Sequence, residues 1–164
     1  MENRWRKINL GSGRIVKRGE YCNIDIMPFE DNSGKQLVDL VLDIEKRKLP
    51  FEDSFIEEII AENVLEHLGD GFIFALNECH RVLKSDGVLR GCVPVAGTRE
   101  DYMDITHKRH FIIDSFKYIT GTGLAKSNRP SHPRYADYGV LPWRQVELER
   151  KGNLINFVLK PRKI

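Results

Sequence analysis

The sequence predicts an α/β fold: a mostly parallel sheet in a single domain of residues 1–164, closed at its C-terminal end by an antiparallel hairpin. Short apolar runs that end in polar, Gly or Pro residues alternate with helical patterns, which is typical of strands joined by crossovers. The last two runs alternate around Lys151-Gly152-Asn153 and predict the hairpin. At 164 residues and 41% hydrophobic content, the chain has material for one core.

The apolar runs place the expected helices and strands. Residues 72–83 repeat apolar side chains every three or four positions and predict the main helix, which ends at residues 84–87. Asp114 is expected to cap a shorter helix that ends at Gly121, because glycine accepts a left-handed backbone there. Strands are predicted at residues 7–10, 21–26, 37–42, 58–61 and 88–93, and the hairpin at residues 143–149 and 154–160.

The connections between the first strands are short, so the helices are expected to be abbreviated. Ten residues separate Leu10 from Tyr21, and a crossover that holds a helix needs at least about ten to twelve. Residues 27–36 are too polar and broken for a good helix. One face of the sheet should then be thinly covered, and apolar area left in water forgoes about 25 cal/mol per Å². We therefore predict a homodimer, or a C-terminal segment folded back over that face.

Composition indicates which bound groups, which cellular compartment and which charge of substrate to expect. Three widely spaced cysteines indicate neither a disulfide framework nor a zinc site, and no metal is expected. No run approaches the roughly 18 apolar residues that cross a bilayer, so we expect a cytoplasmic protein without membrane contact. Residues 25–66 carry twelve acidic and four basic side chains, whereas residues 105–164 carry twelve basic and four acidic. The cationic C-terminal third fits either an anionic substrate or an ordinary soluble surface.

A glycine turn and an acidic residue point to a ligand. The run Ile8-Asn9-Leu10 stops at Gly11-Ser12-Gly13, and Asp25 closes the next apolar run. Glycines let backbone N–H groups approach a ligand without a Cβ clash, and a carboxylate at that place can accept hydrogen bonds from a ribose diol. The pattern favours a nucleotide-like ligand, although Gly-x-Gly also marks ordinary tight turns.

Five motifs in order resemble the class I S-adenosylmethionine-dependent methyltransferases, and in particular their small type 11-like group. Members of that group read LNLGCG, NVDI, DLE with LPF, VLEHL and RVLKPGG. The corresponding segments here are Ile8-Asn9-Leu10-Gly11-Ser12-Gly13, Asn23-Ile24-Asp25-Ile26, Asp43-Ile44-Glu45 with Leu49-Pro50-Phe51, Val64-Leu65-Glu66-His67-Leu68 and Arg81-Val82-Leu83-Lys84-Ser85-Asp86-Gly87. The resemblance covers roughly residues 7–120 and implies a Rossmann-like sheet, with the closing hairpin as the family's last two strands.

The resemblance implies how the methionine and ribose parts of S-adenosylmethionine are held. Gly11, Ser12 and Gly13 would form the turn under the methionine part, and Asp25, followed by Ile26, would take both ribose hydroxyls. Asn9 stands where many of these enzymes have an acidic residue that helps to hold the ammonium group of the cofactor. Binding at that point is expected to be weaker here.

The resemblance also implies the adenine and methyl ends of the site. Asp43 would face the adenine amino group, and Ile44 would supply a backbone contact and an apolar wall. Glu62 and Asn63, at the carboxyl end of the fourth strand, would lie near the transferable methyl. Without the order of the motifs, Asp43 and Glu62 would be interpreted as solvated strand ends.

Three histidines are candidates for a catalytic role. Methyl transfer from a sulfonium is an in-line displacement, which mainly requires an acceptor atom held about 3 to 3.5 Å from the methyl carbon. A hydroxyl acceptor would gain from a general base, and His67, His107 and His110 are eligible. The alternative is structural: His67 packs or caps a turn, and His107 with Arg109 ties a loop to nearby carboxylates.

The acceptor is expected to be a small molecule or a glycan. Residues 126–142 form a long segment rich in turn formers. Unless it is an ordinary surface loop, it would grip an anionic or sugar-like acceptor by charge and stacking, through Arg129, Arg134, Tyr135 and Tyr138. Nucleic acid is disfavoured, because Asn63-Val64-Leu65 lacks the Asn-Pro-Pro-aromatic motif of amino-directed DNA enzymes. Two other classes stay open: a non-catalytic S-adenosylmethionine-binding or scaffold protein, and a redox enzyme, which Val16 in place of a third glycine disfavours.

Overall fold

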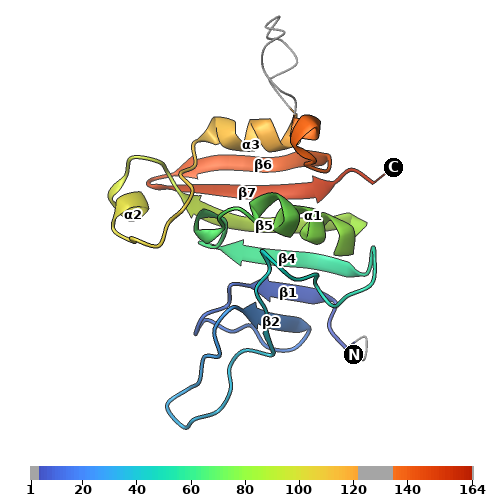
Figure 1. The fold of residues 1–164 in the computed structure, drawn as a ribbon, viewed down its shortest axis with the longest axis vertical. Coiled ribbons are helices and arrows are strands. Elements are labelled where there is room, and N and C mark those ends of the chain that lie inside the picture. The colour runs from blue at the N-terminus through green and yellow to red at the C-terminus, as the bar shows by residue number, and fades with distance from the viewer. Residues whose placement is uncertain (1–3, 122–134, 164) are drawn as a thin grey trace, which may run out of the picture.

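The computed structural model describes residues 4–121 and 135–163, which are built around one seven-stranded sheet of order β3-β2-β1-β4-β5-β7-β6 (Figure 1). The first five strands run parallel, and β7 enters antiparallel between β5 and β6. This confirms the predicted sheet and its closing hairpin. The strands are β1 (Lys7–Leu10), β2 (Tyr21–Asp25), β3 (Leu40–Val41), β4 (Ile56–Glu62), β5 (Leu83–Pro94), β6 (Trp143–Lys151) and β7 (Leu154–Pro161).

Strands β3 and β5 differ most from the prediction in length. Strand β3 has only two residues, because just Leu40 and Val41 pair with β2. Strand β5 begins directly after the main helix, since Leu83 already pairs with Ile56 of β4. The next paired residue of β5 is Val88, so residues 84–87, which were predicted to end the helix, bulge out of the strand.

The main helix, α1 (Phe72–Val82), agrees with the prediction within one residue. Helix α3 (Ile113–Thr120) ends at Gly121, whose φ of 68° confirms the left-handed cap. Its N-cap is Ile112, so the prediction for Asp114 is wrong: Asp114 lies in the first turn and pairs with Lys117 at 2.7 Å. Short helices not predicted are α2 (Arg99–Tyr102) and the 3₁₀ turns η1 (Leu65–His67) and η3 (Tyr135–Tyr138).

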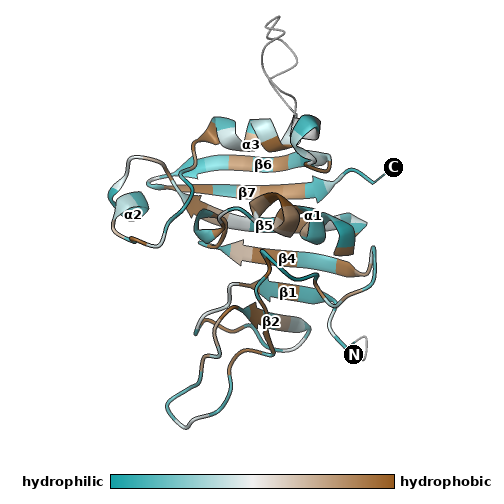
Figure 2. Cartoon of the chain, viewed as in Figure 1, coloured by the Kyte–Doolittle hydropathy of each residue, from teal (hydrophilic) through white to brown (hydrophobic). Residues whose placement is uncertain are grey.

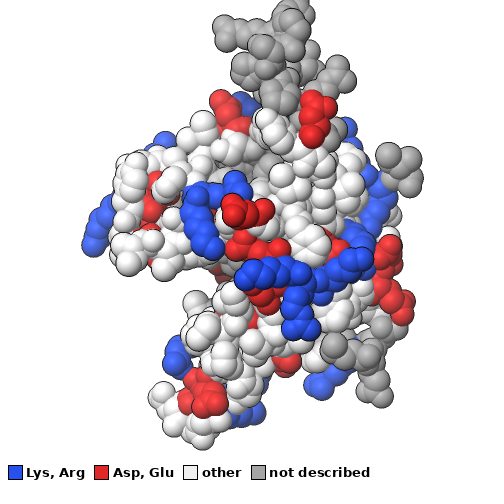
Figure 3. Space-filling model, viewed as in Figure 1, with Lys and Arg blue, Asp and Glu red and all other residues white. Residues whose placement is uncertain are grey.

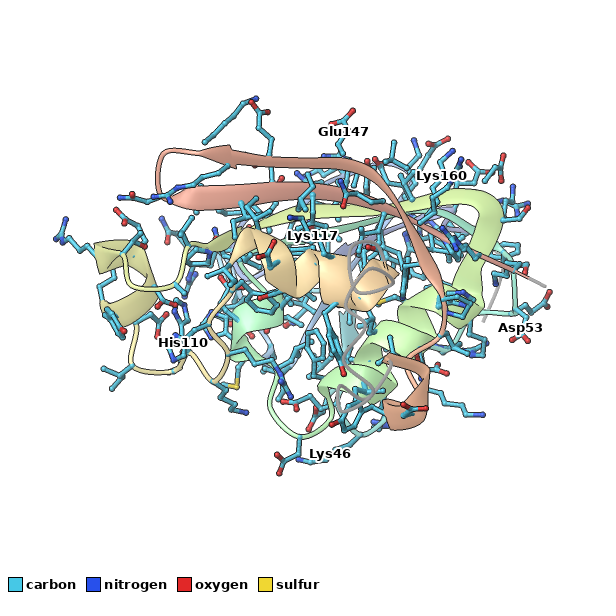
Figure 4. All side chains as sticks on the ribbon, turned by 90° about the horizontal axis from the view of Figure 1, so that it is seen from above. Lys46, Asp53, His110, Lys117, Glu147 and Lys160 are labelled. Carbon is cyan, nitrogen blue, oxygen red and sulfur yellow. The ribbon has the colours of Figure 1, made fainter. Side chains whose placement is uncertain are left out.

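Both longer helices, α1 and α3, pack on the same face of the sheet. Figure 4 shows them on one side, with Lys117 of α3 there and with Glu147 and Lys160 on the opposite side. Figure 2 shows apolar residues along α1 and along the central strands. Side chains that alternate toward the helices, such as Ile8 and Ile59, are fully buried in one apolar cluster. No described helix is long and apolar enough to cross a membrane.

The other face of the sheet carries polar side chains. Tyr21 donates a hydrogen bond to the Glu58 carboxylate, and Arg90 Nε donates to the same carboxylate over 2.5 Å. Asn9 Nδ2 donates to Asn23 Oδ1 over 3.0 Å. These groups come from four neighbouring strands, so polar contacts between strands extend over this face of the sheet.

This polar face removes the reason for the predicted homodimer. The face is without helices, as predicted, but the prediction assumed that apolar area would be left in water. Among the described residues, just two buried aliphatic side chains, Val38 and Ile60, lie outside the main cluster. The described C-terminal segment does not fold over this face either: Lys163 Nζ donates to the Arg81 carbonyl at the end of α1 over 2.8 Å. A parallel sheet can thus expose one face when its side chains alternate as in antiparallel sheets.

Candidate functional site

The glycine turn after β1 is held by the end of β2. Gly11 has a φ of 60° and Gly13 a φ of 50°, both in the left-handed region. A Cβ on Gly11 would lie 2.5 Å from Val64 Cγ2, so the turn packs directly against the segment that follows β4. The Gly13 backbone N–H donates to Asp25 Oδ2 over 2.8 Å. The turn and the carboxylate are therefore in direct contact.

A cavity of about 660 Å³ opens at the carboxyl ends of β1, β2 and β4. Figure 3 shows an indented outline at this side of the molecule, between the segment around α2 and the lobe formed by residues 26–40. Asp43 lies in the wall, and its hydrogen bond with Lys46 holds the pKa of that carboxyl below its ordinary value. Seven of the predicted cofactor residues line the cavity: Gly11, Gly13, Asp25, Ile26, Asp43, Ile44 and Asn63.

The other three predicted cofactor residues do not line this cavity. Asn9 stands between two core-facing residues of β1, so strand alternation turns its side chain to the polar face, where it donates to Asn23. Glu62 is turned the same way and lines a separate cavity with Arg90 and Cys92. Ser12 is buried in the turn, and its N–H donates to the Ile24 carbonyl over 3.1 Å. The two-residue period of the strands could have revealed the orientation of Asn9 and Glu62.

A second cavity, of about 600 Å³, adjoins the first. Asn63 and His67 line both cavities. Asn63 has a φ of 53°, which is rare for a residue with a side chain, and its N–H donates to the Cys92 carbonyl over 2.9 Å. The remaining lining of the second cavity is Glu66, Pro94, Glu100, Met103, Asp104, His107, Lys151, Asn153 and Leu154.

Hydrogen bonds define the protonation of two of the three histidines. Thr106 Oγ1 donates to Asp104 Oδ1 over 2.7 Å, so it must accept from His67 Nδ1, which lies 3.0 Å away. His107 Nδ1 lies 2.8 Å from the Asp101 carbonyl oxygen, which can only accept. Both rings therefore carry a proton on Nδ1, and Nε2 is the nitrogen that is bare when the ring is neutral. Burial lowers the pKa of His67 and favours its neutral form.

His110 lies apart from the other two histidines. Its Nδ1 is 2.8 Å from the Asp101 carboxylate, and it lines neither of the two cavities. Arg109 does not reach a carboxylate: its Nη2 donates to the Gly69 carbonyl over 2.7 Å and its guanidinium lies over the Phe72 ring. Of the predicted histidines, the structure brings only His67 and His107 to the second cavity.

Glu66 is the main residue that sequence reasoning missed. It is only 1% exposed, and neither carboxylate oxygen has a hydrogen-bond partner among the described residues. Burial raises the pKa of Glu66 to about 7. The motif Val64-Leu65-Glu66-His67-Leu68 supplied a signal, since an acidic residue there is surrounded by apolar ones. Its neighbour in space, His107, comes from a distant segment and could not be paired with it from the sequence.

The predicted acceptor loop is only partly described. Arg129 and Arg134 lie outside the described residues. At the end of the segment, the Gly139 carbonyl accepts from Asn77 Nδ2 over 2.7 Å, and the Leu141 N–H donates to Asn77 Oδ1 over 2.9 Å. These two bonds tie residues 139–141 to helix α1.

Comparison with known proteins agrees with this geometry. Residues 11–90 match the type 11 family model described as a methyltransferase domain. A putative methyltransferase of Haloferax volcanii, solved with the Trm112 methyltransferase activator, has a TM-score of 0.63 at 14% identity, with 100% of this chain and 85% of that chain covered. A S-adenosylmethionine-dependent methyltransferase of Archaeoglobus fulgidus has a TM-score of 0.60 at 15% identity, with 95% and 86% covered.

A third solved structure contains ligands. The 1,6-didemethyltoxoflavin-N1-methyltransferase of Burkholderia thailandensis, with 1,6-didemethyltoxoflavin and S-adenosylhomocysteine bound, has a TM-score of 0.61 at 11% identity. The alignment covers 96% of this chain and 71% of that one. At such identities these likenesses establish the fold. No curated protein matches the chain.

The sheet order, the glycine turn and the matching domain define a class I S-adenosylmethionine-dependent methyltransferase. Residues 11–90 match the type 11 methyltransferase model, and together with the structural neighbours this match supports S-adenosylmethionine as the cofactor.

Proposed function

We propose that this enzyme transfers a methyl group from S-adenosylmethionine to a small-molecule or glycan acceptor by in-line displacement. One observation carries the proposal: a cavity lined by the glycine turn, Asp25 and Asp43 adjoins a second cavity through Asn63 and His67. In-line transfer needs a donor site and an acceptor site that meet at one point. The shared residues supply such a point.

The residues of the first cavity fit the cofactor. A cavity of about 660 Å³ is in the range of nucleotide-sized ligands. Gly13 leaves open space where a Cβ would stand, so backbone can approach a ligand there. Asp25 uses one lone pair of each oxygen on the Gly13 and Met27 N–H groups, which leaves the others for ribose hydroxyls. Bound there, S-adenosylmethionine supplies an electrophilic methyl on sulfur.

The second cavity is proposed to hold the acceptor. Its carboxylates, Glu66, Glu100 and Asp104, outnumber its one ammonium, Lys151. Such a lining disfavours an anionic acceptor and suits a polyhydroxyl one. The bare Nε2 atoms of His67 and His107 are able to take up a proton or a cation from the acceptor side. His110 is not part of the proposal, because it lines neither cavity.

The test compares Asp25→Asn with Asp31→Asn, a matched change in the neighbouring loop that does not line the cavity. Calorimetry should show a loss of S-adenosylmethionine affinity of about 10- to 100-fold for Asp25→Asn, because one charged hydrogen bond acceptor is lost. Asp31→Asn should bind like the wild type. NAD should not shift the melting temperature, whereas cofactor at 100 times its Kd adds about 2.7 kcal/mol.

Turnover separates the enzyme from a cofactor-binding scaffold. A panel of catechols and neutral glycosides, with sugar nucleotides as the anionic comparison, is incubated with radiolabelled S-adenosylmethionine. We expect label to pass to at least one hydroxyl compound and none to an oligonucleotide. Tight cofactor binding without transfer to any class of acceptor would instead support the non-catalytic alternative, and equal cofactor affinity in both aspartate variants would contradict the assignment of the cavity.

A further inference from the structure

Glu66, His67 and His107 form a cluster at the second cavity, here called the Glu-His-His cluster. Each offers one ligand atom, and the three atoms lie within 4.8 Å of one another. The cluster joins two segments that the backbone holds together, since the Lys108 and Arg109 N–H groups both donate to the Glu66 carbonyl, over 2.8 and 3.0 Å. The two backbone segments that carry the three side chains are therefore joined by main-chain bonds.

The two histidines are oriented for coordination. Their rings lie 4.7 Å apart between centroids, and each donates its Nδ1 proton to an oxygen, that of Thr106 or that of the Asp101 carbonyl. Metal-binding histidines are held in the same way, with one ring N–H on an outer oxygen and the other nitrogen on the ion. The remaining lone pairs of both rings are those on Nε2.

Glu66 supplies a second, independent observation. Its carboxylate is buried, has no hydrogen-bond partner and forms no ion pair with any described Lys or Arg. An unpaired buried carboxylate costs several kcal/mol, and proteins rarely keep one without a function. A cation held between this carboxylate and the two imidazoles would satisfy all three groups at once.

We propose that Glu66, His67 and His107 bind one divalent transition-metal ion, with Zn²⁺ as the representative, at the acceptor end of the site. Two imidazole nitrogens and one carboxylate are a zinc donor set that leaves a further coordination position open. Mg²⁺ prefers oxygen ligands and is disfavoured. Bond lengths of about 2.1 Å would draw the three ligand atoms to about 3.4 Å from one another. The proposal departs from the expectation, based on cysteine spacing, that no metal is bound.

The consequence for the acceptor rests on the proposed function. An ion at this place would bind an oxygen of the acceptor and lower its pKa. The site would then favour acceptors with a hydroxyl or enol oxygen over amines, whose protonated forms compete poorly for a cation.

The test measures metal binding directly. The full chain, freed of any tag and treated with a chelator, is titrated with ZnCl₂ against a chromophoric chelator, and bound metal is counted by mass spectrometry. We expect one Zn²⁺ per chain. Glu66→Gln and His107→Ala should each weaken Zn²⁺ binding by at least about 10- to 100-fold, the range known for loss of outer partners alone. His110→Ala, in the same segment, and Cys92→Ser, the half-buried thiol, should keep the wild-type affinity.

A milder variant tests the proposal even if Glu66→Gln does not fold. Thr106→Val changes an exposed residue and removes the partner of His67 Nδ1 together with the hydrogen bond to Asp104, so it should fold and weaken Zn²⁺ binding by about 10-fold. No Zn²⁺ uptake by the wild type at micromolar metal, or uptake that survives both ligand variants, would overturn the metal site. S-adenosylmethionine affinity, measured on the same samples by calorimetry, tests the cofactor cavity separately.

Discussion

Gly11 shows how one residue couples the fold to the cofactor cavity. Its left-handed backbone ends β1, and the absent side chain lets the turn lie against Val64, in the segment that leads to Asn63 and Glu66. A side chain there would meet two separate penalties, one in the backbone and one in packing. The backbone cost and the packing cost can be measured separately, because a substitution at another glycine, Gly152, meets only the backbone cost.

We predict that Gly11→Ala lowers the free energy of unfolding by about 2 to 4 kcal/mol, since a left-handed alanine costs about 1 to 2 kcal/mol and the clash with Val64 adds to it. Gly152→Ala is the control, because Gly152 has the same φ of 60° but open space at its Cβ position. It should lose about 1 to 2 kcal/mol and keep its cofactor affinity. Urea denaturation measures the free energy of unfolding of both variants. Equal losses in the two variants would show that Val64 can move aside without a loss of stability.

At the scale of elements, Arg81 connects helix α1 to the segment before β4. Its guanidinium donates to the carbonyls of Leu49 and Phe51 and to the carboxylates of Glu78 and Asp53. The hydrogen bonds with Glu78 raise the pKa of Arg81 further above its ordinary value. A planar fork with five N–H groups can serve all four partners, and an ammonium group cannot.

We predict that Arg81→Lys destabilises the protein by about 1 to 3 kcal/mol, because the buried carboxylate of Glu78 and two carbonyls lose donors. The control is Lys84→Gln, which breaks a pair between exposed partners, Lys84 and Glu57, and should leave the urea midpoint nearly unchanged. Equal urea midpoints for Arg81→Lys and the wild type would show that the hydrogen bonds of the Arg81 guanidinium do not stabilise the protein.

At the scale of the whole molecule, both edges of the sheet are protected against pairing with another chain. Edge strand β3 has two residues, and edge strand β6 carries charged side chains and a bulge between Gln145 and Glu147. The open face presents the Tyr21-Glu58-Arg90 network rather than apolar area. These features favour a single chain in solution.

We therefore predict a monomer by light scattering at micromolar concentration, in place of the homodimer expected from the sequence. The result should be the same at low and at high salt, because the uncovered face of the described sheet is polar and no dimer is expected to form through it. A dimer mass that persists in the variant Glu147→Lys, on the open face, would show that some other surface forms an interface.

The lining of the first cavity could largely be predicted from the sequence, and that of the second could not. Seven of the ten predicted cofactor residues line one cavity, because the glycine turn and the strand ends are local features that a parallel sheet brings to one edge. Asn9 and Glu62 were misjudged, since a residue at a strand end points to either face according to its register. Glu66 and His107 meet only through the packing of two distant segments.

By itself, the sequence determined the glycine turn, the main helix, the closing hairpin and the order of motifs, because each depends on backbone preferences and on periods within a few neighbouring residues. Only the tertiary structure decided that the uncovered face is polar, and that a buried carboxylate meets two imidazoles beside the second cavity. The reason is physical: burial and charge pairing depend on which distant segments pack together, and a local pattern does not contain that information.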